Sequence, residues 1–429
     1  MFKLIFLRVQ YRVLGIVLPC VMSIPTLAQS QDLWTLEIAT QRVLEIAPES
    51  KSSQSEIRAR QGALQQAGAW PNPKIELRAD DKVGKDTGTG GTDLTVLTLS
   101  QSIPVSGRLG YQKAVASAEL NAARSTKRYQ QLILENQSAQ RFHTLQLAVA
   151  RLRLAEKRLQ LADELQKAGQ RRAKAGDIPK LERLRLDLIR EAAQQILDKY
   201  EGKYNEALSQ FRAYLELPIT IIPELSSLEP FEPVPELENL LAGLPRHPAL
   251  VAAKYRMEGA RQEVHLISAG RLPDPELRLF YEQDFLNGRR QDVMGVGIGI
   301  SIPLWDRKKG RLQEVRAQMD QSLWKFKALE RDLGSRLKQS YLHLSHLVQQ
   351  GEHYRTRVYE PAGMVFDLTR KAYVSGEVEI LSLIDANNTY FDANERYLEL
   401  LQEAWLEAAD LRLAAGRILV TTEQDTDHE

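Results

Sequence analysis

The sequence predicts a mainly α-helical protein with a small β part, organised as two structural repeats. Residues 109–172 contain no proline and only two glycines, which is typical of one uninterrupted helix. Residues 74–80 alternate apolar and polar side chains after a P-x-P motif, and a similar strand pattern follows a second P-x-P motif about 200 residues later. Alternation with period two is typical of a β-strand, so each repeat is expected to hold a hairpin among long helices.

Four landmarks of the repeat recur in the same order at a spacing close to 200 residues. Self-similarity at one fixed spacing is the sequence signature of a duplicated structural unit. The pairs are Ala47-Pro48 with His247-Pro248, Pro71-Asn72-Pro73 with Pro273-Asp274-Pro275, Ser102-Ile103-Pro104 with Ser301-Ile302-Pro303, and 175–178 with 375–378. We therefore expect each half to run as helix, hairpin, very long helix, tight break and long helix.

Residues 1–28 have the features of a secretory signal peptide. Three basic residues precede a mostly apolar run from Val13 to Leu27, and a small-residue cleavage pattern ends at Ala28. We expect this segment to be removed, and the alternative is an uncleaved anchor. The single cysteine, Cys20, lies within it, so the mature chain is expected to have neither disulfides nor thiolate metal sites.

The mature chain is close to electrically neutral. Of 57 basic residues, removal of residues 1–28 takes away three and no acidic ones, which leaves 54 against 56 acidic residues. This balance gives no electrostatic basis for binding nucleic acid. No later run of about 18 apolar residues occurs, so no transmembrane helix is predicted, although a transmembrane β-strand leaves a much weaker trace.

A proline-rich connector separates the two repeats. Seven prolines between residues 218 and 248 preclude a long helix there, apart from a short one expected at 236–241. The predicted units are a first repeat at 29–217 with its hairpin at 74–103, the connector at 218–248, a second repeat at 249–417 with its hairpin at 276–302, and a disordered tail at 418–429.

The long helix of the first half carries two apolar stripes with a period of seven residues. Positions two apart on a helix differ by about 200° of rotation, so the stripes lie on nearly opposite flanks and predict a neighbouring helix on each side. The alternative is an ordinary large helical bundle. The stripes are Leu145, Leu152 and Leu159, and Leu147, Leu154 and Leu161.

The two hairpins suit strands that cross an outer membrane, because one face is apolar and the other small or polar. The alternatives are soluble hairpins packed on helices and, for the GVGIG stretch at 295–299, a nucleotide loop, whose glycine spacing does not match. Four strands cannot close a barrel, and lipid does not tolerate an open sheet edge. If the hairpins enter a membrane, the barrel must be shared between subunits, and three chains would supply twelve strands, enough for a water-filled lumen.

Three groups of residues resemble the TolC-type outer-membrane efflux channels, in particular the heavy-metal branch that works with cobalt, zinc and cadmium exporters. They are AGAWPNP (67–73) and AGRLPDP (269–275), the hairpin exits at 101–104 and 302–303, and KAYVSGEVEILSLIDANNTYFDA (371–393). The resemblance implies a homotrimer in the outer membrane of a Gram-negative bacterium, in contact with its lipid. In this trimer a 12-stranded outer-membrane β-barrel continues into a long periplasmic α-helical barrel. It also implies a periplasmic adaptor protein and an inner-membrane efflux pump of the resistance-nodulation-division type.

The resemblance also implies where the functional sites lie. Gly176 and Gly376 are expected at the periplasmic tip turns, where glycine permits a positive φ. Counted from the tip glycines, Glu182 and Asp385 are the expected acids of an entrance gate and Tyr373 its bonding tyrosine. Some relatives carry a further acid where this chain has Ser382, so its carboxylate ring is expected to be weaker. The alternatives are plain helical hairpin turns and solvated helix charges.

Prolines mark the expected boundaries between helices and strands, because proline stops a helix and favours extended geometry before it. The expected helix-to-strand junctions are Pro71, Pro73, Pro273 and Pro275, and the strand-to-helix junctions are Pro104 and Pro303.

The sequence favours a transport role without catalysis. No nucleophile elbow, phosphate-binding loop or zinc-protease motif is found, so neither an enzyme nor a cofactor is predicted. His343, His346 and His353 are interpreted as a solvated helix face, because no cysteine or paired carboxylate completes a metal site. The predicted function is the exit duct of a tripartite efflux system, and the alternative is a secreted structural or adhesive coiled-coil protein without a pore. The sequence does not identify the exported substrate.

Overall fold

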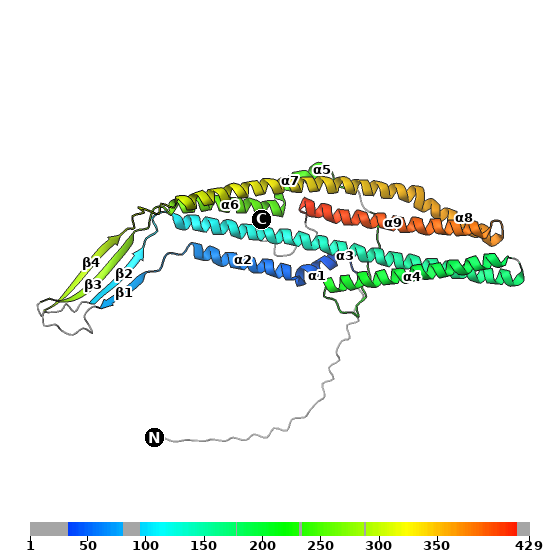
Figure 1. Cartoon of the computed structure of the whole chain (residues 1–429), viewed down its shortest axis with the longest axis horizontal. Helices are drawn as coiled ribbons and strands as arrows, with labels where there is room; N and C mark the ends of the chain where they lie inside the picture. Colours follow the sequence, from blue (N-terminus) through cyan, green and yellow to red (C-terminus); the bar gives the residue numbers. More distant parts are fainter. Residues whose placement is uncertain (1–32, 80–94, 177, 231–233, 287–288, 418–429) are drawn as a thin grey trace, which may run out of the picture.

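The computed structural model is an elongated molecule with a sheet at one end and helical hairpins at the other (Figure 1). It describes residues 33–79, 95–176, 178–230, 234–286 and 289–417. The expectation of a mainly helical chain with a small sheet is confirmed. The predicted signal peptide and the predicted tail lie outside the described residues.

Both halves run through a helix, two strands and long helices in that order, although not every element has a counterpart. The first half consists of α1 (Leu36–Ile46), α2 (Pro48–Ala67), β1 (Lys74–Ala79), β2 (Thr95–Ser102), α3 (Arg108–Ala175) and α4 (Lys180–Tyr214). The connector holds α5 (Leu237–Gly243) and the 3-10 turn η1 (Leu244–Arg246). The second half consists of α6 (Pro248–Ala269), β3 (Glu276–Leu286), β4 (Arg289–Gly299), α7 (Lys309–Tyr354), the π-helical turn η2 (Arg355–Tyr359), α8 (Glu360–Ser375) and α9 (Ile380–Ala415).

Helix α3 runs the length of the helical part and has different neighbours at its two ends (Figure 1). Near the sheet the helices pack in the order α2, α3, α6, α7, and towards the far end in the order α4, α3, α9, α8. Leu145 lies in the core that α3 forms with α1 and α4. Leu161, with Leu154 packed beside it, belongs to the core shared with α8 and α9. The predicted neighbour on each flank of α3 is thus present.

The four strands form one antiparallel sheet in the order β1, β2, β3, β4. Its register aligns apolar side chains in rows across the strands, and many of these side chains are exposed on the isolated chain. The rows are Ile75, Leu99, Leu279 and Val296, and Leu77, Leu97, Tyr281 and Met294. The opposite face is mixed, and there Phe280 covers Gly295, where an added Cβ would lie 2.2 Å from the ring.

The end of the second hairpin and the bounds of the connector helix differ from the sequence expectations. The second hairpin was expected to end at residue 302, but β4 ends at Gly299. Pro303 has no N–H to donate to a neighbouring strand, which favours an end of the strand before it. The short connector helix covers 237–243 instead of 236–241. Among the described residues, no helix is long and apolar enough to cross a membrane.

The long helix of the second half is interrupted, whereas the sequence repeat predicts the same very long helix in both halves. Pro361 cannot donate a hydrogen bond, and its ring clashes with the carbonyl four residues earlier in a regular helix. The chain widens into the π-helical turn η2 just before it, and the Glu360 N–H bonds back to the Arg355 carbonyl. Such a turn is a recognised way for a helix to absorb a local misfit.

Candidate functional site

Both helical hairpins at the end remote from the sheet turn on a glycine. Gly176 ends α3 with a φ of 83°, and Gly376 ends α8 with a φ of 82°. The amide of each glycine caps the preceding helix, donating to the Ala173 carbonyl at 3.2 Å and to the Tyr373 carbonyl at 3.1 Å. Any residue with a Cβ would be strained at these positive φ angles, so both positions require glycine on conformational grounds.

Helices α3 and α4 pack very closely just behind the first tip. A Cβ placed on Gly169 would lie 2.1 Å from Cδ1 of Leu186, which is itself fully buried. Ile178, next to the turn, packs into the same place. In the sequence Gly169 stands out only as an isolated glycine in a helix, although such a residue often marks a close helix contact.

Tyr373 and Glu182 are brought together beside the tips. The Tyr373 side chain is only 5% exposed, and the Arg172 guanidinium carbon lies 5.6 Å from its ring centre. Burial raises the pKa of the Tyr373 phenol, and the Glu182 carboxylate raises it further. The phenol oxygen is buried without a hydrogen bond of normal geometry to the described residues. Among the described residues, Arg172 alone lowers this pKa, through its charge and a hydrogen bond that falls short of normal geometry, so the isolated protomer satisfies the hydroxyl poorly.

Asp385 is placed differently from the other two expected gate residues. It lies on α9, is exposed, and forms no hydrogen bond or ion pair with the part of the chain that the structure describes. Ser382, one turn earlier, is also exposed. The structure of the single chain therefore assembles Tyr373 with Glu182 and Arg172 but leaves Asp385 apart from them.

The two tips carry opposite charge. Residues 166–186, which flank Gly176, contain seven basic and two acidic residues, for a net charge of +5. Residues 366–386, which flank Gly376, contain two basic and four acidic residues, for a net charge of −2. The tip of the α3–α4 hairpin is called the basic tip below, and the tip of the α8–α9 hairpin the acidic tip.

The two outer helices of the far layer are α4 and α8, and both expose large apolar side chains, on α4 close to the tip. On α4 the exposed residues recur at positions i, i+3 and i+7, which places them on one face. A stripe of this kind on a water-soluble surface marks a contact site. The exposed large apolar residues are Leu181, Leu184 and Leu188 on α4, and Met364, Val365, Leu368 and Val374 on α8.

The helix–strand junctions are tied to one another by polar contacts. Pro71 and Pro73 precede β1, Pro273 and Pro275 precede β3, and Pro104 and Pro303 follow β2 and β4. The Gln101 side chain donates to the Pro71 carbonyl at 2.9 Å, and the Ile103 amide donates to the Pro275 carbonyl at 2.9 Å. Arg108 pairs with Asp274 at 2.5 Å, which joins the first exit to the second entry.

Exposed tryptophans flank the same junctions. Trp70 precedes the first P-x-P motif, and Trp305, which is 92% exposed, follows Pro303. Tryptophan is enriched at the level of lipid headgroups, where one end of the ring is apolar and the other can meet water. The residues at this end of the helices therefore fit a membrane–water boundary.

A buried polar cluster fastens the connector to α3 and α9. The ring of His143 stacks on Trp405 with 5.1 Å between centres, and its Nδ1 is 2.8 Å from Oε1 of Gln146. The Gln146 amide in turn donates to the Ser226 carbonyl at 2.8 Å. Burial lowers the pKa of His143 to about 4, so this imidazole is neutral at ordinary pH. No motif in the sequence singles out this cluster.

The three histidines of α7 are all exposed. His343 forms a contact of 2.8 Å between its Nδ1 and Oε2 of Glu407 on α9. Within the described residues, no group of three His, Cys, Asp or Glu side chains is arranged to hold a metal ion. His343 thus links α7 to α9.

Comparison with known sequences finds relatives over most of the chain. Residues 242–417 match the family model described as outer membrane efflux protein. The cobalt-zinc-cadmium resistance protein CzcC of Cupriavidus metallidurans is 24% identical over 375 residues, which cover 84% of this chain and 85% of that protein.

Comparison with solved structures shows the fold. The open state of the Neisseria gonorrhoeae MtrE outer membrane channel superposes with a TM-score of 0.72 at 16% identity, over 90% of this chain and 89% of that one. The Vibrio cholerae outer membrane protein VceC superposes with a TM-score of 0.69 at 16% identity, over 89% and 96% of the two chains. At this level of identity the likeness establishes a shared architecture.

Proposed function

Because the chain belongs to the outer membrane efflux protein family, we propose that it is the outer-membrane exit duct of a tripartite efflux system. It conducts substrate passively from an inner-membrane pump and a periplasmic adaptor to the exterior, and it is not an enzyme. The duct is located in the outer membrane, with a large helical part in the periplasm. Each chain contributes two repeats, 29–217 and 249–417, joined by the connector.

The single observation that carries this proposal is the four-stranded sheet. Two rows of apolar side chains cover one face and are exposed in the isolated chain, with Met294 85% exposed. Exposure of this apolar face to water is unfavourable, and contact with lipid would bury it. In the same sheet β1 and β4 each have one edge without a strand partner among the described residues.

The open edges support a trimer. In lipid every backbone N–H and C=O must be paired, so β4 of one chain pairs with β1 of the next until the barrel closes. Three chains supply twelve strands, which is enough for a water-filled lumen. The exposed apolar residues of α4 and α8 lie on the two outer helices of the far layer, so the same symmetry brings them into contact between neighbours.

The tips form the periplasmic entrance of the duct, and Glu182, Tyr373 and Asp385 act as its gate. The poorly satisfied phenol of Tyr373 supports this role, because a neighbouring chain can supply a hydrogen bond of better geometry than Arg172 of its own chain. Asp385, exposed and unpaired among the described residues, supplies the carboxylate that repeats around the trimer axis. A ring of carboxylates attracts cations. Replacement Asp385→Ala is therefore expected to reduce block by multivalent cations, and unchanged block removes Asp385 from the entrance.

The junction residues set the depth of the barrel in the membrane. Pro71, Pro73, Pro273 and Pro275 end the periplasmic helices, and Pro104 and Pro303 end the strands. Trp70 and Trp305 lie at the level of the headgroups.

The relatives support a proposal for the cargo and the partners. The CzcC protein is named for resistance to cobalt, zinc and cadmium, and we extend that substrate class, heavy-metal cations, to this chain. The pump partner is of the resistance-nodulation-division type. Substrate choice rests mainly with that pump, because the duct has no metal-binding group among its described residues.

The alternative function is a secreted structural or adhesive coiled-coil protein without a pore. A protein of this kind would also have long helices, but its function would not require an apolar sheet face or a closed barrel. The sheet therefore distinguishes the two functions.

Purified protein reconstituted in planar bilayers tests the duct. Wild-type trimers are expected to conduct. Val296→Arg places a charge on the apolar face and is expected to impair insertion, at a cost of about 2–4 kcal/mol near the bilayer midplane. The matched control Thr98→Arg lies on the opposite face of the sheet and is expected to insert. Absence of conductance from intact wild-type trimers, or equal insertion of both variants, counts against the duct.

A further inference from the structure

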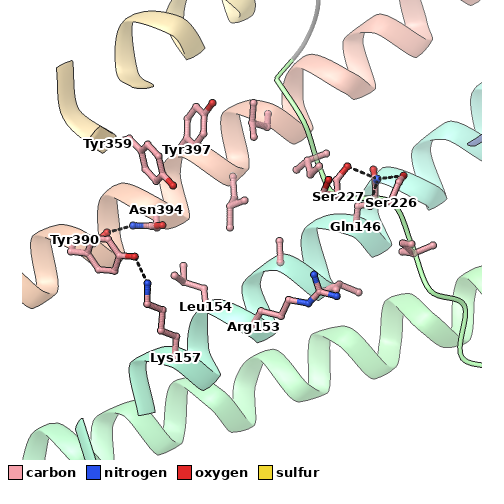
Figure 2. Close-up of a pocket in the computed structure, with 16 residues that line it drawn as sticks. Gln146, Arg153, Leu154, Lys157, Ser226, Ser227, Tyr359, Tyr390, Asn394 and Tyr397 are labelled. Atoms are coloured by element: carbon pink, nitrogen blue, oxygen red, sulfur yellow. Dashed lines mark hydrogen bonds between the residues drawn. The ribbon is translucent and has the colours of Figure 1, made fainter. Parts of the chain in front are cut away.

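A pocket opens between the middle of α3, the middle of α9, the π-helical turn η2 and the connector (Figure 2). Its cavity is about 460 Å³, within the range of about 300–1,000 Å³ that small-molecule sites occupy. Tyr359, Tyr390 and Tyr397 line one side. On the other side Lys157 rises from α3 towards Tyr390, and Arg153 extends along α3 towards the connector end. This pocket is distant from the tips and from the sheet.

The charge in the pocket is positive and unbalanced. Arg153 and Lys157 are one helical turn apart on α3, where two like charges repel each other. Arg153 forms no hydrogen bond or ion pair with the described residues, and Lys157 donates to the Tyr390 hydroxyl at 2.7 Å. The lining contains no aspartate or glutamate. An anion would supply the missing counter-charge.

The walls supply flat aromatic surface. The rings of Tyr359 and Tyr397 stack with 4.6 Å between centres and an interplanar angle of 26°. The Lys157 ammonium lies 5.0 Å from the centre of the Tyr390 ring, which fixes that ring beside the positive charge. Leucines, among them Leu154, complete an apolar floor. A ring system can therefore stack or pack here while a charged group meets the cations.

The pocket stays open when chains associate through their outer edges. Its main walls, α3 and α9, are the two inner helices of the far layer, whereas α4 and α8 form the edges. The connector closes one end, where the Gln146 amide holds the Ser226 carbonyl. The site is thus built within one chain from both repeats and the connector.

From this geometry we propose that the pocket is a binding site for an organic anion that carries an aromatic ring, a carboxylate or sulfonate. The acidic group pairs with one of the two cations, Arg153 or Lys157, and is attracted by the charge of the other, and the ring lies against the tyrosines. Asn394, whose amide donates to the Tyr390 carbonyl at 2.7 Å, keeps its side-chain oxygen at the pocket wall for a donor group on the ligand. The proposal does not depend on the proposed function, because no step of it uses the pore.

Isothermal titration of the full-length trimer in nanodiscs tests the site, with naphthalene-2-sulfonate as the probe. Saturable binding is expected, and Arg153→Gln and Lys157→Gln are each expected to weaken it, by about tenfold for a lost charged hydrogen bond. The matched control is Arg171→Gln, an exposed arginine of the same helix that has no partner among the described residues and lies at the basic tip. It is expected to bind like the wild type.

Two comparisons decide the outcome. The uncharged 2-naphthalenemethanol is expected to bind far more weakly than the sulfonate, and Lys157→Arg is expected to retain most of the affinity because it keeps the charge. Equal binding of alcohol and sulfonate, unchanged affinity in the Arg153→Gln and Lys157→Gln double variant, or absence of saturable binding at millimolar probe each overturns the proposal. Conductance of the double variant is expected to be normal, so loss of this site is distinguishable from failure of the duct.

Discussion

The α3–α4 hairpin and the α8–α9 hairpin end in the same turn but differ in nearly every side chain around it. Both turns place a glycine at a φ close to 82°. The positions nine residues after the tip glycines hold Arg185 in one and Asp385 in the other, and the flanking net charges are +5 and −2. The positive φ at the turn requires glycine in both halves. The surrounding charges do not determine the turn geometry, so they can differ between the halves.

The long helices differ in the same way. Helix α3 is continuous, whereas its counterpart is divided by η2 just before Pro361. The position 200 residues before Pro361 is Leu161, a buried residue of the core with α8 and α9. One proline therefore changes a straight helix into two helices with a bend between them (Figure 1).

Two histidines 200 residues apart, one in each half, differ in how far they are exposed to solvent. His143 on α3 is 4% exposed and stacked on Trp405. His343 on α7 has a side chain that is 57% exposed and contacts Glu407. The connector covers the first position and leaves the second open to solvent.

The largest effect is expected from His143. Its pKa of about 4 in the folded state is below its ordinary value of 6.5, chiefly because of burial; the Arg412 charge lowers it further and Glu37 opposes this. Between pH 6.5 and 4, His143 is therefore protonated in the unfolded chain but neutral in the folded chain. The contribution of neutral His143 to the free energy of unfolding is fully present above pH 6.5. It falls by about 3 kcal/mol as the pH drops from 6.5 to 4.

The measurement is the thermal unfolding midpoint of the trimer as a function of pH. His143→Asn is expected to flatten the loss between pH 6.5 and 4, because asparagine keeps a donor for Gln146 and does not titrate. The control is His343→Asn, at the exposed position, which is expected to keep the slope of the wild type. Equal slopes in wild type and His143→Asn would contradict the assignment.

The second effect is expected at Gly169, behind the basic tip. Gly169→Ala forces the buried Leu186 side chain to move and is expected to destabilise the hairpin by about 1–3 kcal/mol. The matched control is Gly202→Ala on α4, where a Cβ meets nothing within 4 Å in the chain. It is expected to stabilise the helix by about 0.5–1 kcal/mol. Hydrogen exchange at the α3–α4 turn measures the difference, and two variants of the same sign would refute it.

The sequence was sufficient for the features that local rules determine. The period of seven along α3 indicated its two neighbours, glycine and proline indicated turns and junctions, and the alternation at 74–80 indicated a strand. It was not sufficient for features that depend on tertiary contacts. The burial of His143 results from the connector folding over it, and the contact of Gly169 with Leu186 from the angle between two helices. Pro361 was visible, but its accommodation by a π-helical turn depends on the backbone around it.

The third effect concerns Tyr373, which has no equivalent in the first half, where Ala173 stands 200 residues earlier. Within one chain its hydroxyl has no hydrogen bond of normal geometry to the described residues, and Arg172 supplies only one that falls short of it, so Tyr373→Phe is expected to change the stability of the protomer by about 1 kcal/mol or less. If a neighbouring chain supplies the partner in the trimer, the same variant raises single-channel conductance of the closed duct. Ala173→Ser is the control at the equivalent position of the basic tip. A variant with unchanged conductance removes Tyr373 from the gate.

The smallest effect is expected from exchanging the charges that distinguish the two tips. Charges in contact with solvent contribute little to stability, about 1 kcal/mol or less, so Arg185→Asp and Asp385→Arg should both form trimers with nearly wild-type unfolding midpoints. Their effect appears in ion selectivity, because a charge near the entrance changes the local concentration of ions of opposite sign. Asp385→Arg is expected to shift the reversal potential towards anions and Arg185→Asp towards cations, and high salt should reduce both shifts by screening. The double exchange preserves the net charge and is expected to restore most of the wild-type selectivity. If Asp385→Arg shifts the potential and Arg185→Asp does not, the acidic tip alone faces the ion path and the basic tip faces outward.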